Sequence, residues 1–318
     1  MYGGKMTTRM IDALPLEIRK MKSKEIKQSI QLSEGRVICC ETIGTFIPAH
    51  LMRFANAEIA AVFGADLLLF NMYNSKNPQI FGLPDKNPLS KLDLLSSYMP
   101  QGKGCTLQDV KDLTGRVIGV NLEPMKNAAM AAAIPWAIAT PKNAKNVADQ
   151  GADFICLTGN PSTGVTSQGI AKAAAEIKKE MADRLLIFAG KMHGAGTTDP
   201  VITEADIDIY ADAGVDVILL PAPGTVPGIT VEFAHSIVEK AHAAGMLVMS
   251  TIGTSQEASP TSTIEQIALM SKMAGADIHH LGDAGLPGLA QPDNIMALSY
   301  TIRGRSRTWS RMASVLRK

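Results

Sequence analysis

A short phrase recurs four times along this chain, and each copy separates an Ala-rich stretch from an apolar run. The phrase is a glycine, then alanine or valine, then aspartate, and its copies begin at Gly64, Gly151, Gly214 and Gly275. A glycine at such a boundary is typical of the left-handed residue that ends a helix. The apolar run that follows is typical of a strand buried on both faces, as in a parallel sheet. The phrase therefore predicts a chain in which helices alternate with parallel strands.

Four further apolar runs occur before and between these copies and bring the number of predicted strands to eight. The predicted strands are Val37–Cys40, Leu67–Phe70, Val117–Val120, Phe154–Leu157, Leu185–Ala189, Val217–Leu220, Leu247–Ser250 and Ile278–Leu281. Eight strands that alternate with helices indicate an α/β fold, a single (β/α)8 barrel.

The barrel is expected over residues 37–303, which leaves a segment at each end. Residues 1–36 contain a Lys-rich amphipathic stretch, Ile11–Gln31, and predict an N-terminal helical extension that closes the bottom of the barrel. The first barrel helix is expected to begin just after Pro48, and the last to end at Arg303. Residues 304–318 are then a basic C-terminal tail, either solvated or docked on another subunit.

Two long insertions follow strands two and three. Residues 72–105 are rich in Gly, Pro and Asn, with one short helix expected over residues 89–98, and residues 122–139 are apolar and Ala-rich. Loops of this length are usually lids, binding loops or contact surfaces. Their large apolar side chains favour a homo-oligomer packed through the insertions. The alternative is that the insertions fold back as a lid over their own barrel.

Composition excludes several classes of function. The 318 residues suit one barrel, and the net charge of +1 provides no field that would attract nucleic acid. No apolar run reaches the length of about 18 residues that a membrane span needs, and no signal peptide is evident. Four cysteines lack the spacing of a metal or redox site, which favours free thiols in the cytoplasm.

Polar and glycine-rich residues follow every predicted strand. In barrel enzymes the site lies at the carboxyl ends of the strands, so these residues are expected to meet at one mouth. Those singled out are Glu41, Asn71, Asn121, Glu123, Thr158, Asn160, Lys191, His193, Thr225, Gly253, Thr254, His280, Gly282, Asp283 and Gly285.

The proposed catalytic residues are Glu41, Lys191, His193 and Asp283. Lys191 follows an apolar strand, where desolvation would suit its amine to form a Schiff base or to act as a base. Pairing of Lys191 with Glu41 or with a substrate carboxylate is the alternative. Glu41, His193 and Asp283 are candidates for proton transfer.

A divalent cation is the alternative to a covalent lysine. Its candidate ligands are Glu123, His193 and His280. His279 and His280 are neighbours on one strand, so only one of them faces the barrel interior, and His280 is expected to be that residue. No nucleotide-binding motif is present, and the sequence does not identify a cofactor.

The glycine-rich ends of strands seven and eight predict an anion site. Gly253, Thr254, Gly282 and Gly285 could present backbone N–H groups and a hydroxyl to a phosphate or carboxylate. The alternative is that these glycines only form tight turns. Further substrate contacts are expected from Asn71, Asn121, Thr158, Asn160 and Thr225.

The chain resembles the phosphate-binding TIM barrels. The resemblance rests on the repeated glycine phrase and on the glycine-rich ends at Gly253 and Gly282–Gly288. These barrels include tryptophan synthase alpha-like enzymes, aldolases and the phosphoenolpyruvate mutase and isocitrate lyase group. The resemblance implies a lyase or isomerase that acts on a small phosphorylated or carboxylated metabolite. Strand one carries Cys39-Cys40-Glu41 where metal-hydrolase barrels have a His-x-His pair, and strand six ends in Pro221 where many Schiff-base aldolases have lysine. A metal-dependent hydrolase or enolate-forming enzyme, or a barrel that binds a metabolite or partner without turnover, are the alternatives.

Overall fold

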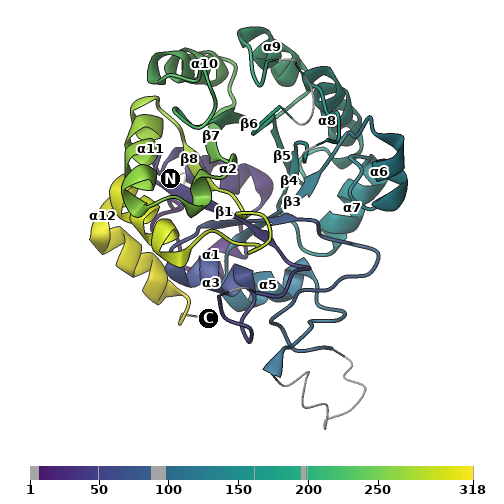
Figure 1. Ribbon diagram of the computed structural model, residues 1–318, viewed down its shortest axis with the longest axis vertical. Coiled ribbons are helices and arrows are strands. Elements are labelled where there is room, and N and C mark those ends of the chain that lie inside the picture. Colours follow the sequence, from purple (N-terminus) through teal and green to yellow (C-terminus); the bar gives the residue numbers. More distant parts are fainter. Residues whose placement is uncertain are drawn as a thin grey trace, which may run out of the picture.

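Eight parallel strands close into one barrel in chain order, with β8 paired to β1. The computed structural model describes residues 7–48, 50–86, 98–160, 162–194, 198 and 200–317. The strands are β1 Val37–Ile43, β2 Leu67–Asn71, β3 Val117–Leu122, β4 Phe154–Leu157, β5 Leu186–Ala189, β6 Val217–Pro221, β7 Leu247–Ile252 and β8 Ile278–Leu281. The prediction of a single (β/α)8 barrel is confirmed, and each predicted strand lies within three residues of an observed one (Figure 1).

Helices surround the strands on the outside of the barrel (Figure 1). They are α1 Pro15–Ile18, α2 Ser23–Gln31, α3 Asn56–Phe63, α5 Leu107–Thr114, α6 Ala128–Ala133, α7 Pro141–Asp149, α8 Ser167–Met181, α9 Glu204–Asp212, α10 Val231–Ala243, α11 Thr261–Met273 and α12 Pro292–Ser314, with a 3₁₀ turn η1 Gln256–Ala258. Within the described residues, no helix combines the length and apolar character that a bilayer crossing requires. The first barrel helix, α3, begins at Asn56 and not just after Pro48, so that predicted helix start is wrong.

The aspartate of each repeated phrase links two neighbouring strands. It precedes an even-numbered strand, and its carboxylate accepts a hydrogen bond from a backbone N–H near the start of the preceding odd-numbered strand. The pairs, carboxylate first, are Asp66 with Ile38, Asp153 with Ile118, Asp216 with Ile187 and Asp277 with Val248, at 2.8–3.1 Å. The phrase therefore ends a helix with its glycine and aligns a strand pair with its aspartate.

Asp66 also lies at the centre of a buried ion-pair cluster. Its carboxylate is 2.6 Å from Arg303 Nη1 and 2.7 Å from Arg311 Nε, and all three side chains are buried. Arg116 lies beside them, fully buried, and donates a hydrogen bond to the Arg311 carbonyl. The cluster fixes the last helix against the start of β2.

The last helix continues beyond the predicted barrel boundary. It does not end at Arg303 but kinks at Gly304, where φ is 74°, and α12 runs on to Ser314. Arg311, expected in a solvated or subunit-docking tail, is 2% exposed. The predicted basic tail therefore contributes a buried cation to the fold.

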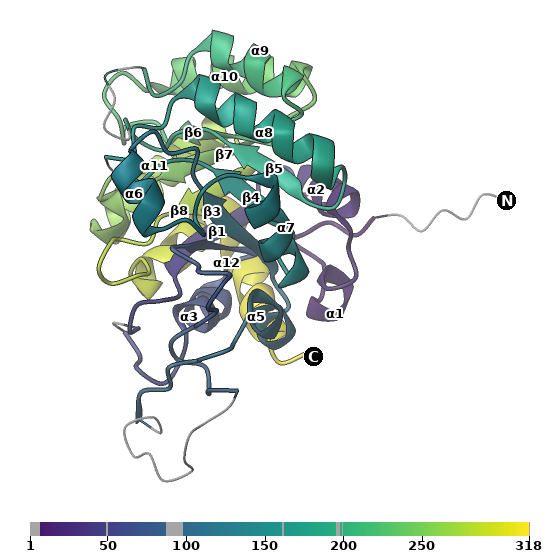
Figure 2. The ribbon, with the colours of Figure 1, turned by 90° about the vertical axis from the view of Figure 1, so that its right-hand side faces the viewer.

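The segment before β1 covers the bottom of the barrel. The predicted helix over Ile11–Gln31 is two short helices, α1 and α2, at the end of the barrel away from α6 (Figure 2). Met10, Ile18, Ile26 and Ile30 pack in one cluster with the inward-facing apolar residues of the strands. They shield the lower layer of the barrel interior from water.

Side chains on alternate positions of each strand fill the barrel. Phe154 on β4 and Phe188 on β5 stack with ring centroids 4.3 Å apart. Gly119 on β3 makes room for them, because a Cβ there would lie 2.2 Å from the Phe154 ring. The same alternation continues up each strand, so the residues two positions above the apolar layer face the mouth.

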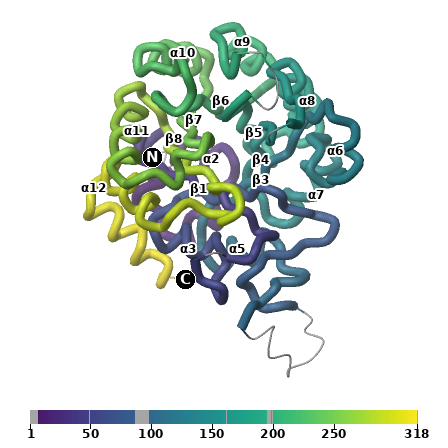
Figure 3. The backbone as a smooth tube through the Cα atoms, in the orientation of Figure 1, coloured from purple at the N-terminus to yellow at the C-terminus, as the bar shows by residue number. Residues whose placement is uncertain are grey.

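The insertion after β2 folds partly onto its own barrel. Tyr73, Ile80 and Leu83 are buried in the core cluster between strands and helices. An antiparallel bridge between Gln79 and Lys103 joins its two ends. The described part of the insertion runs out beyond α3 and α5 (Figure 3). The short helix predicted over residues 89–98 falls almost entirely outside the described residues.

We expect Asp66→Asn to destabilise the protein by about 3–5 kcal/mol, because it leaves buried guanidinium groups without their counter-charge. Urea unfolding measures this loss. The matched control is Asp183→Asn, whose exposed carboxylate pairs with exposed Lys24 at 2.7 Å. The control is expected to leave the stability close to that of the natural protein, because solvent screens an exposed ion pair. Equal small losses in both variants would contradict a structural role for the cluster.

Candidate functional site

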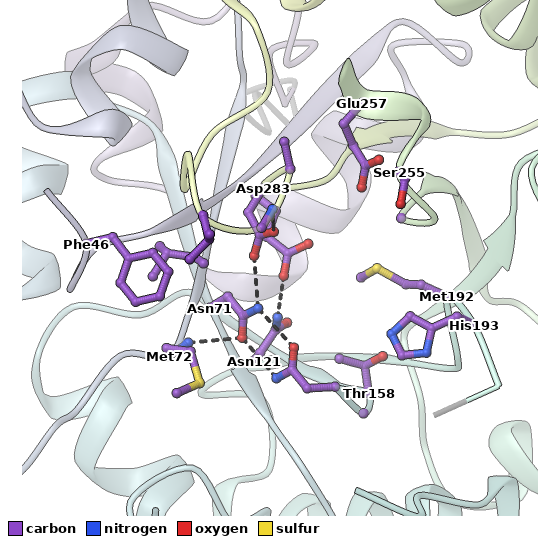
Figure 4. Close-up of a pocket in the computed structure, with 18 of the residues that line it drawn as sticks. Phe46, Asn71, Met72, Asn121, Thr158, Met192, His193, Ser255, Glu257 and Asp283 are labelled. Atoms are coloured by element: carbon purple, nitrogen blue, oxygen red, sulfur yellow. Dashed lines mark hydrogen bonds between the residues drawn. The ribbon is translucent and has the colours of Figure 1, made fainter. Parts of the chain in front are cut away.

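A cavity of about 670 Å³ opens at the carboxyl ends of the strands. Residues after β1, β2, β3, β4, β5, β7 and β8 line it (Figure 4). The lining residues are Glu41, Ile43, Phe46, Asn71, Met72, Asn121, Thr158, Gly159, Asn160, Met192, His193, Gly253, Ser255, Glu257, Ala258, Asp283, Ala284, Gly285 and Leu286. This is the end of a barrel at which enzymes carry their active sites.

Nine of the residues singled out from the sequence line this cavity. They are Glu41, Asn71, Asn121, Thr158, Asn160, His193, Gly253, Asp283 and Gly285. Sequence reasoning did not select Phe46, Met72, Met192 and Glu257 for the site.

Glu41 lies at the inner end of the cavity, 6% exposed. Asn121 Nδ2 donates a hydrogen bond of 2.6 Å to its Oε1, and His280 Nε2 lies 3.3 Å from its Oε2. His280 thus faces the barrel interior, as expected, whereas Nε2 of His279 lies 3.0 Å from the Gly35 carbonyl oxygen. The Glu41 carboxylate is therefore hydrogen-bonded from β3 and lies against an imidazole of β8.

A chain of hydrogen bonds crosses the mouth from β8 to β4 (Figure 4). Asn71 Nδ2 donates to Asp283 Oδ2 at 3.0 Å and to Asn160 Oδ1 at 3.1 Å. Asn160 in turn donates its side-chain and backbone N–H groups to Glu123. The amides of Asn71 and Asn160 therefore connect Asp283, which lines the cavity, with Glu123, which does not.

Burial and mutual repulsion set the protonation of the acidic groups. Burial, followed by the nearby charge of Glu41, raises the pKa of Asp283 to about 6. Burial also raises the pKa of Glu257, although its own backbone N–H opposes the shift. In Glu123, burial raises the pKa and the hydrogen bonds from Asn160 oppose it. Asp283 is therefore a carboxyl group that gains and loses its proton close to neutrality.

His193 lies across the cavity from Phe46 (Figure 4). Burial lowers the pKa of its imidazole, and the charge of Glu41 opposes the shift. A lowered pKa leaves His193 neutral at pH 7, so that its ring can donate one hydrogen bond and accept another.

The glycine-rich ends of β7 and β8 differ from the expected anion site. The Gly285 N–H donates to Asp283 Oδ1 at 2.8 Å, so the protein's own carboxylate occupies that donor. Thr254 Oγ1 donates to the Thr225 carbonyl at 2.9 Å, and Thr225 Oγ1 donates to the Ala222 carbonyl at 2.7 Å. Gly282 packs so closely that a Cβ would lie 2.5 Å from a Glu257 oxygen. Thr225, Thr254 and Gly282 therefore hold the loops and do not line the cavity.

Lys191 and two of the predicted metal ligands also lie outside the lining of the cavity. The Lys191 ammonium is 1% exposed and donates a hydrogen bond of 2.8 Å to the Pro200 carbonyl. Glu123 binds Asn160 and His280 lies against Glu41, so the structure does not bring them together with His193. In the described part of the chain, no three His, Cys, Asp or Glu side chains form a group that could hold a metal ion.

Comparison with known proteins gives the family and the fold. Residues 11–318 match the family described as "Domain of unknown function (DUF7916)". The chain belongs to this family. No curated protein matches it. The resemblance to TIM barrels is confirmed at the level of the fold, by the closed eight-stranded barrel.

Three solved structures are similar to the chain at low sequence identity. Thiamine phosphate pyrophosphorylase from Pyrococcus furiosus is 15% identical, with 85% of this chain and 97% of that chain covered and a TM-score of 0.45. For 2,3-dimethylmalate lyase, a PEP mutase/isocitrate lyase superfamily member, the identity is 11%, the coverage 87% and 94%, and the TM-score 0.47. KGPDC from Streptococcus mutans is 14% identical, with 86% and 98% covered and a TM-score of 0.44. Likeness at this level carries no argument about the reaction.

The stability of the protein is expected to record the titration of Asp283. Its pKa is raised from 3.8 to about 6, so the folded state holds this proton more tightly than the unfolded chain. The resulting stabilisation is present below pH 4 and is lost as the pH rises to 6. We expect the stability of Asp283→Asn, relative to the natural protein, to rise by on the order of 2 kcal/mol across this window, measured by urea unfolding.

Asp183→Asn serves again as the control. Lys24 lowers the pKa of Asp183, so the small contribution of this carboxylate is lost as the pH falls, and the difference curve has the opposite slope. A flat difference curve for Asp283→Asn would show that Asp283 titrates as it does in the unfolded chain.

Proposed function

We propose that this protein is a lyase or isomerase that moves a proton at a carbon atom of a small metabolite. The observation that carries the proposal is Asp283, a carboxyl group with a pKa of about 6 in a cavity at the carboxyl ends of the strands. An acid–base catalyst works best when its pKa lies close to the working pH.

The other groups supply the remaining roles in this proposal. Glu41 is the base, because the hydrogen bond from Asn121 fixes its carboxylate at the inner end of the cavity. Asp283 exchanges a proton with the opposite end of the reacting group, and Asn71 holds it in place. Neutral His193 binds a carbonyl or hydroxyl oxygen of the substrate from the other side of the cavity.

The proposal also includes the substrate class and the cellular compartment. The glycine-rich end of β7 favours a small carboxylated or phosphorylated metabolite, because Gly253 lines the cavity. Such an anion would bind at the outer rim, away from Glu41. Four free, buried cysteines support a reducing compartment such as the cytoplasm.

Deuterium incorporation tests the reaction on a mixture of compounds, so the substrate does not have to be identified first. The protein is incubated in D₂O with pooled small metabolites, and mass spectrometry follows the gain of carbon-bound deuterium. Removal of a proton from carbon, or protonation of a carbanion left by bond cleavage, places solvent deuterium on carbon. We expect incorporation into one compound or a small group, reduced by roughly 10²-fold or more in Asp283→Asn.

Glu239→Gln is the control for this experiment, because Glu239 is exposed on α10 and far from the cavity. The control is expected to keep the natural rate. Absence of incorporation from every pool would favour the alternative of a barrel that binds its ligand without turnover.

Assembly into a homo-oligomer remains a prediction. Its support is apolar surface left on the insertions, with Tyr98 61% exposed and no buried residue on α6. Light scattering at micromolar concentration is expected to give a mass that is a multiple of 33.8 kDa. A monomer mass would leave the lid as the role of the insertions.

A further inference from the structure

The inner wall of the cavity carries two buried acceptors that lack a partner. Asn121 on β3 and Thr158 after β4 are 5% and 4% exposed, and both line the cavity. Among the described residues, none hydrogen-bonds to Asn121 Oδ1 or Thr158 Oγ1. Buried polar atoms in native proteins are usually paired, so each unpaired one calls for an explanation. A bound molecule that donates hydrogen bonds at this wall supplies one.

The charge around these acceptors is negative. Asn121 binds Glu41 through its Nδ2, which places Oδ1 beside that carboxylate. Asp283 and Glu257 complete an acidic lining, and no lysine or arginine of the described chain lines the cavity. Burial raises the pKa of Asp283, and the nearby charges of Glu41 and Glu257 raise it further.

Three chemical groups can be compared as occupants of this wall. A phosphate or carboxylate could accept a hydrogen bond from the Thr158 hydroxyl, but it would place an acceptor against Asn121 Oδ1 and a negative charge against Glu41. A hydroxyl would satisfy one acceptor but leave the charge unbalanced. An ammonium has three donors and a positive charge, and so matches both the unpaired oxygens and the carboxylates.

We propose that the wall formed by Glu41, Asn121 and Thr158 binds a protonated amine of the substrate. This inference rests on the proposed function, since it names the substrate class of that same site: a small amine-bearing metabolite. The ammonium contacts Asn121 Oδ1, Thr158 Oγ1 and the Glu41 carboxylate. An anionic part, where the metabolite has one, lies toward the outer rim.

Three probes of similar size separate charge from shape. Ethanolamine, ethylene glycol and glycolate share a hydroxymethyl group and end in an ammonium, a hydroxyl and a carboxylate, respectively. Binding is measured at pH 7 by calorimetry and by the rise in Tm, with inorganic phosphate and MgCl₂ as further probes. We expect ethanolamine to bind more tightly than ethylene glycol by roughly tenfold or more, and glycolate to bind least.

Thr158→Val removes one acceptor with little change of shape. We expect it to weaken ethanolamine binding by roughly fivefold to tenfold. Thr301→Val, on α12 and away from the cavity, is the matched control and should bind ethanolamine like the natural protein. Unfolding curves of both variants show whether each is folded.

The outcomes that overturn this inference differ from the one that overturns the proposed function. Equal binding of ethanolamine and ethylene glycol shows that the wall does not recognise charge, and tighter binding of glycolate or phosphate assigns it to an anion. Stabilisation by MgCl₂ alone assigns the wall to a metal ion. Deuterium incorporation into compounds without an amine leaves the proposed function intact and removes this inference. Binding of ethanolamine without deuterium incorporation into any compound leaves this inference intact and removes the proposed function.

Discussion

Four carboxylates at the bottom of the barrel hold the strands in register. Each accepts a hydrogen bond from a backbone N–H of the preceding strand, and each lies against at least one basic side chain. The partners are Arg303 and Arg311 for Asp66, Lys111 for Asp153, Lys27 and Lys178 for Asp216, and His242 for Asp277. The Asp66 pairs are fully buried, and breaking such a pair is costly, so they stabilise the lower end of the barrel. The cavity that can hold a ligand lies at the opposite, upper end.

The alternation of inward-facing and outward-facing residues continues along each strand from this end of the barrel to the mouth. On β1, Val37 and Cys39 belong to the interior cluster, and the next inward residue is Glu41. Burying that carboxylate is costly unless it is hydrogen-bonded, and an amide on β3, Asn121, supplies the bond. Asn71 does the same for Asp283. The amides therefore hold both carboxylates in place at the mouth of the barrel.

This geometry explains which parts of the molecule the sequence predicts. Apolar runs and glycine stops locate all eight strands, and residues directly at strand ends, such as Asn71 and Thr158, fall into the cavity because alternation still fixes their direction. Farther along a loop, alternation no longer applies. Lys191 therefore turns to the Pro200 carbonyl, and Glu257 reaches the cavity from a 3₁₀ turn with no periodic signal. The role of Arg303 was missed because its partner lies 237 positions away in the chain.

Glycine-rich loops illustrate why a pattern of residues does not by itself define a ligand. A phosphate site needs backbone N–H groups that are free to donate. At the end of β8 the Gly285 N–H is already bonded to Asp283, and Gly282 is required because a Cβ there would lie 2.9 Å from the Ile252 carbonyl oxygen. These glycines thus serve turn formation and close packing. The preference of the cavity then depends on its carboxylates and its unpaired acceptors, and both favour a ligand that brings hydrogen-bond donors and positive charge.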